Sequence, residues 1–170
     1  GMMDTVLNLG INRSVADGLA ENTGNRRFAL DVHRRFIQMF GDVVLGVDPS
    51  ILNAIISEEE RRRGVSHAGD LGPQELRQLI STLRSAISEA VGIAVPDDPY
   101  QQLEQAIRAV FNSWDSRRAI AYRELNGISH DLGTAVSVVS MVYGNMDSSS
   151  CSGVLFTRNP STGEDALFGE

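Results

Sequence analysis

The chain has 170 residues, of which 42% are hydrophobic and 22% are charged, the balance of an ordinary globular domain. Its formal net charge of −7 argues against nucleic acid as the main partner, because a phosphate backbone attracts basic surfaces. No apolar run approaches the roughly 18 residues that cross a membrane, and the first residues predict no signal peptide. Cys151 is the single cysteine, so no internal disulfide can form. Together these features predict a cytoplasmic protein without a membrane partner.

All 15 basic residues are arginine. A Walker-type phosphate loop needs a lysine after its glycines, so this motif is excluded. A dinucleotide-binding Gly-x-Gly-x-x-Gly motif is also absent from the sequence. The histidines, His33, His67 and His130, show no metal-ligand spacing with Cys151. No nucleophile–base pair is recognisable either.

The first part of the chain predicts a loop or strand followed by two helices. Residues 2–12 mix apolar and small polar residues. Asn12 or Ser14 is placed to cap a short helix, and Asn25 precedes a stronger one. That second helix is expected to end at Gly41. Its apolar residues recur every four positions and predict a buried face: Phe28, Val32, Phe36 and Phe40.

Three further helices are indicated by proline at the first helical position, after an aspartate or a glycine. They begin at Pro49, Pro73 and Pro99, and a last short helix is expected near residues 117–125. The glutamates before Arg61, Arg62 and Arg63 are spaced for ordinary ion pairs. The stretch from residue 61 to 72 is predicted to be an exposed loop. The aromatic residues of the later helices are predicted to lie in the core: Phe111, Trp114 and Tyr122.

The last part of the chain has the composition of β structure. Residues 134–143 are rich in β-branched side chains without a helical period, which predicts a strand. A second strand is expected at 153–157, a turn at 159–163 and a third strand near 166–168.

These elements predict an α+β fold. A helical subdomain, residues 13–130, is expected to be inserted between two β-containing segments, residues 1–12 and 131–170. The sheet is expected to be incomplete within the chain.

The serine- and glycine-rich loop between the first two predicted strands is the strongest candidate site. Backbone N–H groups and hydroxyls at such a tip can wrap a polyphosphate, because glycine leaves room for close approach. The strand before the loop is placed to present the backbone of Ser140, Met141 and Val142 to an adenine base. An ordinary solvated loop is the alternative on these grounds.

Arginines are the other candidate binding residues. Arg158 follows the second predicted strand and can meet a phosphate or a carboxylate, or simply face solvent. Arg34 and Arg35 lie off the aromatic stripe of their helix. They are placed either to form a docking patch for an acidic partner or to be solvated as most charged helix faces are.

Several long runs of the sequence resemble pyruvate phosphate dikinases. They are residues 1–10, 23–29, 34–44, 109–114, 118–123, 131–136, 144–146 and 153–164. The likeness runs nearly end to end and is specific. The chain therefore resembles an internal fragment of the ATP-binding domain of that family, and is expected to be too short for the full reaction.

This resemblance implies an ATP-grasp-type nucleotide-binding domain. Such enzymes convert ATP, phosphate and pyruvate into AMP, pyrophosphate and phosphoenolpyruvate through a phosphohistidine on a swivelling domain. The implied cofactors are ATP and Mg²⁺, with the metal ligands outside this chain. The implied partners are the phosphohistidine and pyruvate-binding domains of the same protein.

The resemblance also suggests roles for individual residues, with no catalytic residue and no metal ligand among them. Arg35 resembles a residue that docks the swivelling domain. The candidate nucleotide-binding residues are Ser140, Met141 and Val142 for adenine, and Ser150, Cys151, Ser152 and Gly153 for the phosphates. Cys151 departs from the family pattern, which has glycine there, and Val139 stands where glutamine is common. Two alternatives remain: a non-catalytic helical docking module, or a fragment of a phosphoenolpyruvate synthase-like enzyme.

Overall fold

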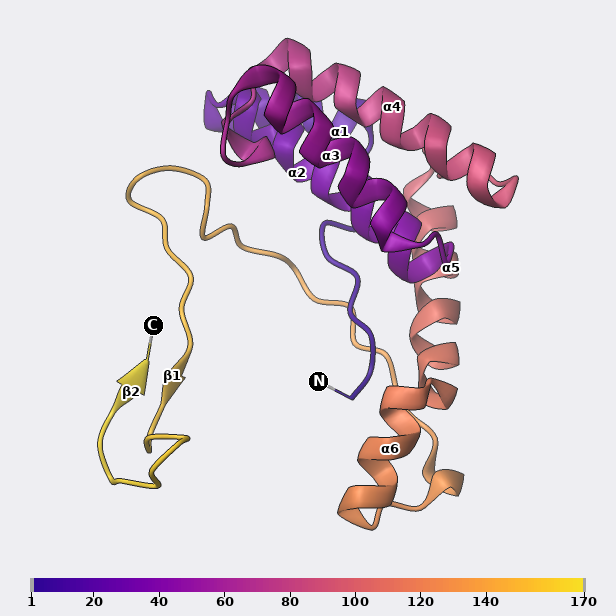
Figure 1. Ribbon diagram of the computed structural model, residues 1–170, viewed down its shortest axis with the longest axis vertical. Coiled ribbons are helices and arrows are strands. Elements are labelled where there is room, and N and C mark those ends of the chain that lie inside the picture. Colours follow the sequence, from indigo (N-terminus) through magenta and orange to yellow (C-terminus); the bar gives the residue numbers. More distant parts are fainter. Residues whose placement is uncertain (1, 170) are drawn as a thin grey trace. The chain divides into compact units, whose positions relative to one another are not determined.

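The computed structural model describes residues 2–169, which divide into two compact units, Gly1–Val139 and Ser140–Glu170. The first unit is helical and the second contains a small two-stranded sheet, so the coarse α+β prediction is confirmed (Figure 1). The α-helices are α1 (Arg13–Thr23), α2 (Arg26–Met39), α3 (Pro49–Arg63), α4 (Pro73–Val91), α5 (Pro99–Asn112) and α6 (Arg117–Asn126). Short helical turns are η1 (Phe40–Val44), η2 (Ala68–Asp70), η3 (Ser113–Asp115) and η4 (His130–Leu132). The strands are β1 (Leu155–Phe156) and β2 (Phe168–Gly169).

The helices begin where the sequence predicts. The side chain of Asn12 accepts a hydrogen bond from the Val15 backbone N–H, and the predicted caps at Asn25, Asp48 and Asp98 act in the same way. Each cap satisfies a backbone donor that has no partner within the helix, which is worth about 1 kcal/mol.

Helix α2 lies at the centre of the first unit, packed against α1 and α4 (Figure 1). The predicted apolar face is buried, with Phe36 and Phe40 fully enclosed and their ring centroids 5.2 Å apart. Helix α4 contributes Leu76, Leu83 and Ile87, which are also fully buried. Each such side chain contributes roughly 1.5–3 kcal/mol of hydrophobic stabilisation, so this interface holds the unit together.

The prediction that Gly41 ends the second helix is wrong. The chain continues through the π-helical turn η1, and Gly41 lies buried inside it. A Cβ atom at this position would lie 2.6 Å from Ile87 Cδ1 and 3.2 Å from Leu52 Cδ1. The glycine is therefore needed for the close approach of three helices rather than for a helix stop.

The stretch from residue 61 to 72, predicted to be an exposed loop, is largely exposed, but it begins inside a helix and buries Ala68 and Leu71. Helix α3 extends through Arg63, where the predicted ion pairs with Glu58 and Glu59 are present. Glu60 instead accepts a hydrogen bond of 2.7 Å from the backbone N–H of Ala68. Ala68 and Leu71 are buried, because they are the apolar residues by which this segment packs on the helices.

The residues before α1 form no strand within 2–12 and run along α5 and α6 as a loop (Figure 1). Buried Gln102 holds this loop: its Oε1 accepts from Gly10 N at 2.9 Å, and its Nε2 donates to the carbonyls of Ile11 and Pro96. Asp4 pairs with Arg118 near the other end of the loop. One side-chain amide therefore joins the N-terminal loop to the segment around the start of α5, about 90 residues away in sequence.

The aromatic residues of α5 and α6 are not the core that was predicted. Phe111 and Tyr122 are exposed, at 46% and 47% of their surface. Trp114 instead forms a platform for Arg123, whose guanidinium lies 3.9 Å from the ring centroid. Arg123 is only 1% exposed and donates to His130 Nδ1 at 2.9 Å. A buried arginine of this kind is stabilised by its hydrogen bonds and by the ring.

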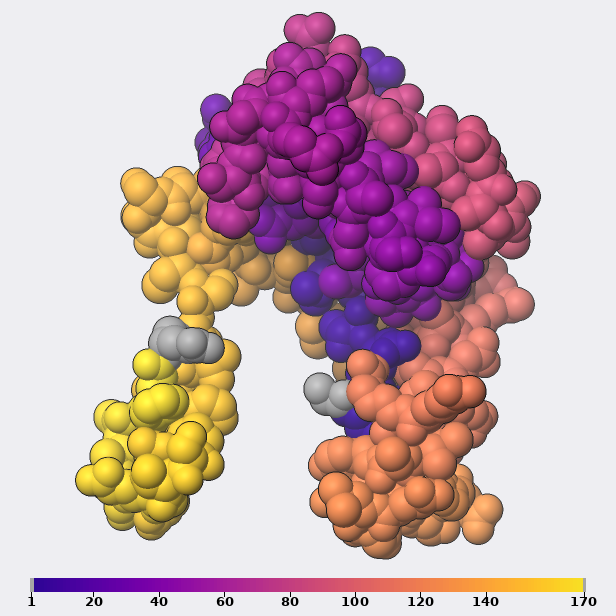
Figure 2. All heavy atoms as spheres, viewed as in Figure 1, coloured from indigo at the N-terminus to yellow at the C-terminus, as the bar shows by residue number. Residues whose placement is uncertain are grey.

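The predicted strand at 134–143 is absent: this stretch is exposed and pairs with no strand of the described chain. β-branched residues favour strands mainly by packing on a sheet, so without a partner their preference is not enough. The second and third predicted strands do form, shortened, as antiparallel β1 and β2 with Phe156 opposite Phe168. Figure 2 shows the yellow residues that include them as a narrow, elongated body.

The free energy of unfolding is expected to fall as the pH drops from about 6.5 to about 4. Burial, and then the charge of Arg84, lower the pKa of His33 from 6.5 to about 4, against the opposite effects of Asp97 and Asp17. Between these values the unfolded chain binds a proton that the folded chain does not, so acid favours unfolding. The contribution is fully present above pH 6.5, and about 3 kcal/mol is lost by pH 4.

Urea unfolding at pH 7 and at pH 4 measures this loss, with His33→Asn as the variant that cannot titrate. The variant should lose less stability between the two pH values than the original chain. His67→Asn is the matched control at an exposed histidine. Equal losses in the original chain and in His33→Asn would contradict the prediction.

Candidate functional site

The predicted phosphate loop is organised by Asp147. Its carboxylate accepts hydrogen bonds from the Ser149 backbone N–H at 2.8 Å, from the Ser149 hydroxyl at 2.7 Å and from the Ser150 hydroxyl at 3.1 Å. The Ser150 backbone N–H donates to the Asp147 carbonyl. These bonds, led by the one from the Ser149 hydroxyl, lower the pKa of Asp147, so it stays ionised at neutral pH.

The remaining donors of the loop are those of Cys151, Ser152 and Gly153. All three residues are exposed, and within residues 2–169 their backbone N–H groups donate to no acceptor. Gly144 lies so close that a Cβ atom there would overlap Ser152 and the carbonyl of Cys151. The two sides of the loop therefore meet at its base, and three consecutive free N–H groups remain on one side.

The predicted adenine-contacting residues lie on exposed, extended backbone. Ser140 and Val142 are exposed, and the Met141 side chain is partly so. Tyr143 follows them, half-buried, and this burial raises the pKa of its hydroxyl. The second unit thus holds the predicted adenine and phosphate residues in one short segment of exposed backbone.

Arg158 is held by the turn that follows β1. The Asn159 side chain accepts from the backbone N–H groups of Ser161 and Thr162, and Gly163 adopts a positive φ of 76°. Arg158 donates to the Gly163 carbonyl at 3.3 Å and pairs with Asp165 at 3.2 Å. Its guanidinium is thus used in the turn, and the interpretation as an ordinary strand-end arginine fits this geometry.

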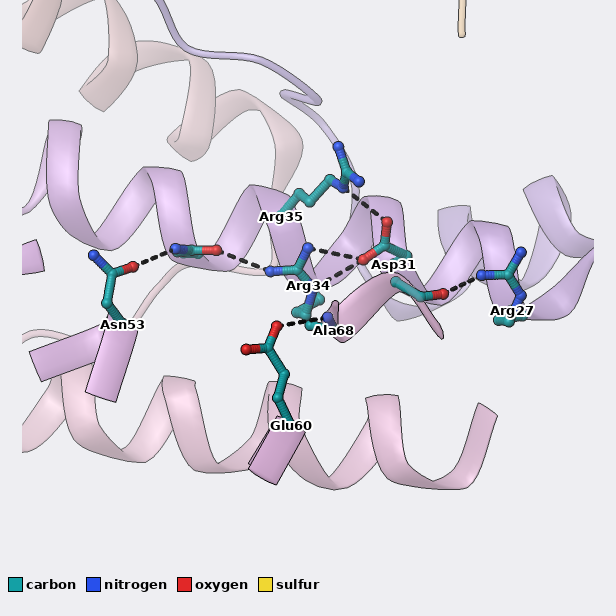
Figure 3. A network of polar contacts seen from close by, with 9 residues as sticks. Arg27, Asp31, Arg34, Arg35, Asn53, Glu60 and Ala68 are labelled. Carbon is teal, nitrogen blue, oxygen red and sulfur yellow. Dashed lines mark hydrogen bonds and ion pairs between the residues drawn. The ribbon is translucent and has the colours of Figure 1, made fainter. Parts of the chain in front are cut away.

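Arg35, the predicted docking residue, belongs to a polar network on α2 (Figure 3). Its Nε donates to Asp31 Oδ2 at 2.7 Å, and its side chain is 52% exposed. Figure 3 shows the end of the guanidinium directed away from Asp31. One carboxylate therefore orients the arginine while its two terminal nitrogens stay available.

Arg34 differs from its neighbour, because its side chain is only 8% exposed. It makes a two-pronged pair with Asp31 Oδ1, at 2.9 Å from Nε and 2.8 Å from Nη2. It also donates to Gln38 at 2.8 Å, and Gln38 donates in turn to Asn53 on α3 (Figure 3). Both alternatives, a docking patch and a solvated helix face, are therefore wrong for Arg34, which is linked to α3 through Gln38.

No group of three or more His, Cys, Asp or Glu side chains is arranged to hold a metal ion within residues 2–169. Asp147 is the carboxylate of the candidate phosphate loop, and its serine donors already surround one of its oxygens. The residues present therefore do not fit a Mg²⁺ site by themselves. No helix in the same described range is long and apolar enough to cross a membrane.

Two residues important for these sites were not found from the sequence. Asp147 precedes Ser149 by two positions, which is the spacing of an Asx turn and could have revealed its role. Asp31 carried a weaker signal: it lies three and four positions before the two arginines, where helical side chains meet.

Residues 1–170 match the family model described as the AMP/ATP-binding domain of pyruvate phosphate dikinase. By its description, this family is a nucleotide-binding class. The chain belongs to this family.

Relatives match over the whole chain. The pyruvate, phosphate dikinase of Rhizobium meliloti is 51% identical over 170 residues, and the chloroplastic pyruvate, phosphate dikinase 1 of Arabidopsis thaliana is also 51% identical. The pyruvate, phosphate dikinase of Clostridium symbiosum is 48% identical over 171 residues. The chain spans 19%, 18% and 20% of the length of these three proteins, respectively. Since bacterial and chloroplastic proteins are about equally similar, the cytoplasmic location stays a prediction.

Asp31→Asn is expected to destabilise the chain by about 3 kcal/mol, because it leaves the buried Arg34 guanidinium without its charge partner. Arg35→Gln removes a half-exposed partner of the same carboxylate and should cost about 1 kcal/mol or less. Urea unfolding at neutral pH compares the two variants. A smaller loss for Asp31→Asn than for Arg35→Gln would refute the importance of the buried pair.

The carboxyl group of Asp147 is expected to titrate below its ordinary pKa of 3.8. The turn is stabilised while this group is ionised, and the contribution disappears as the pH falls through the lowered pKa. The carboxyl ¹³C chemical shift followed against pH gives the midpoint. Ser149→Ala should move the midpoint upward, whereas a midpoint at or above 3.8 in the original chain would contradict the assignment.

Proposed function

We propose that this chain is part of a pyruvate phosphate dikinase, which converts ATP, phosphate and pyruvate into AMP, pyrophosphate and phosphoenolpyruvate through a phosphohistidine. The observation that carries the proposal is the family match over residues 1–170, together with 51% identity to the Rhizobium meliloti enzyme over the whole chain. The relatives named above are all dikinases, which favours this assignment over a phosphoenolpyruvate synthase-like enzyme.

In this proposal the chain supplies two parts of an ATP-grasp-like nucleotide domain. Residues 1–12 and 131–170 belong to the nucleotide-binding lobe, and residues 13–130 form an inserted helical subdomain. The helical content of α1 to α6 and the small sheet of β1 and β2 support this division. The exposed backbone of residues 134–142 is suited to strand pairing in the larger domain.

The loop is assigned to frame the nucleotide rather than to act on it. Ser140, Met141 and Val142 offer backbone groups to adenine, and the free N–H groups of Cys151 to Gly153 offer donors to the phosphates. Ser150 keeps its hydroxyl on Asp147 and supports the loop. When bound to the nucleotide, Mg²⁺ would neutralise phosphate charge, and its ligands lie outside this chain in the proposal. ATP affinity of the isolated chain is therefore expected to be weak.

The helical subdomain is assigned a docking role toward the phosphohistidine domain. The half-exposed guanidinium of Arg35, oriented by Asp31, supports this role because its terminal nitrogens can meet an acidic group. A purely helical docking module without nucleotide contacts is the second candidate function, and the same arginine favours it.

A chimaeric enzyme tests the proposal, in which this chain replaces the matching 170 residues of the Rhizobium meliloti dikinase. The chimaera is expected to convert ATP, phosphate and pyruvate, because identity extends over the entire exchanged segment. A folded chimaera without activity, and without ATP binding, would contradict the nucleotide-framing role.

In that chimaera, Cys151→Gly is expected to lower the KM for ATP by about two- to tenfold, the worth of one recovered hydrogen bond at close approach. Cys151→Ala is the matched control, and its KM for ATP should lie between those of the original chimaera and of Cys151→Gly.

Arg35→Glu should slow the passage of the phosphoryl group while the ATP affinity stays unchanged. Arg108→Glu, which changes another exposed arginine, is its control. An Arg35→Glu enzyme that transfers at the original rate would remove the docking role alone.

A further inference from the structure

A cavity of about 380 Å³ lies between α1, α2 and α4, and no residue of the Asp147 loop lines it. This size falls within the roughly 300–1,000 Å³ of small-molecule sites. The lining residues come at helical spacing from the three helices and from the segment before α5. They are Arg13, Ala16 and Asp17 on α1, Leu30 and His33 on α2, Arg77, Ile80, Ser81 and Arg84 on α4, and Asp97.

The walls of the cavity are fixed by hydrogen bonds. Arg84 pairs with Asp97 at 3.0 Å and donates to the Val95 carbonyl at 2.8 Å, so the segment before α5 is held against α4. Asn12 donates to the Asp97 carbonyl at 2.9 Å and joins this segment to the start of α1. The cavity is thus a built feature of the helical unit rather than a gap between mobile surfaces.

The charge of the lining is not balanced. Its carboxylates already have partners, because Asp97 pairs with Arg84 and Asp17 pairs with Arg26 at 3.4 Å. Arg13 and Arg77 remain: within residues 2–169 their side chains make no hydrogen bond or ion pair. Among the arginines of this range only Arg117 is also unpaired, so two of the three unpaired guanidiniums line one cavity.

His33 provides an independent sign of a missing partner. The residue is only 6% exposed, and its Nε2 makes no hydrogen bond to any described residue. Buried polar atoms normally have a partner. Burial lowers the pKa of His33, so the imidazole is neutral at pH 7 and can donate one N–H to a ligand oxygen. Beside it, Leu30 and Ile80 supply an apolar floor.

We propose that this cavity binds a small organic anion, whose carboxylate or phosphate group pairs with Arg13 and Arg77 and whose apolar body lies on the hydrophobic floor. His33 lines the same cavity from the interior, so its signals report on the bound anion. The site does not depend on the proposed dikinase function, since every residue that forms it belongs to the helical unit.

The test is a titration of the ¹⁵N-labelled 170-residue chain at pH 7, followed through the His33 side-chain nitrogens and the amides of α1, α2 and α4. The probes are phenyl phosphate, benzoate, inorganic phosphate and benzylamine. Phenyl phosphate or benzoate should shift the His33 signals in a saturable way, and the tighter of the two identifies the preferred head group. Inorganic phosphate should bind more weakly, and benzylamine should leave the signals unchanged.

Arg77→Gln should weaken the binding of the better anion by about three- to tenfold, as expected for loss of one partly exposed guanidinium–anion pair. Arg117→Gln is the matched control, because it removes another exposed and unpaired arginine from α6, and its affinity should equal that of the original chain. Both changes are at the surface, so the fold should be retained.

The proposal is overturned if neither aromatic anion shifts His33, or if benzylamine binds equally well. It is also overturned if Arg77→Gln and Arg117→Gln weaken binding to the same extent. Equal affinities for inorganic phosphate and phenyl phosphate would remove the apolar part of the site.

Discussion

The apolar contacts of α2 with α1 and α4 hold the helical unit together, and the buried pair of Asp31 and Arg34 is the polar interaction that this packing requires. The pair allows the charged side of α2 to be buried at Arg34, while Phe36 and Phe40 are buried on the apolar side of the same helix. A charged side chain that leaves water needs a partner with good geometry, and Arg34 has two contacts to one carboxylate oxygen. Because the same carboxylate also orients Arg35, one residue links the packing of the unit to the surface at which docking is proposed.

Helix α2 therefore has three different surroundings along its length and around its axis. The apolar face packs on the neighbouring helices, the Asp31 network reaches α3 through Gln38 and Asn53, and His33 faces a cavity. Packing of this density leaves little freedom for any of the three to change alone. A substitution that moves α2 is thus expected to affect the core, the docking arginine and the cavity together. A substitution of an exposed residue at the cavity mouth is expected to affect the cavity alone.

The helices could be predicted because their signals are local: Asn12, Asn25, Asp48 and Asp98 cap the helices that follow them. Amphipathic spacing, however, assigns every charged residue to solvent, so it could not reveal that Arg34 and Arg123 are buried. Those positions depend on partners that other segments supply. The strand expected at 134–143 failed for the corresponding reason, since a strand requires a neighbour and β propensity alone does not provide one.

The proposed phosphate loop would approach phosphates without a lysine. Its serines are committed to the ionised Asp147, which shapes the turn but adds a negative charge near any phosphate. The backbone donors of Cys151 to Gly153 carry only partial positive charge, so they can orient a phosphate chain without neutralising it. Phosphoryl transfer needs that neutralisation from cations, which makes framing rather than catalysis the chemistry that this segment can perform. The arginines that are unpaired within residues 2–169 lie instead on the helical unit, where Arg13 and Arg77 line a cavity.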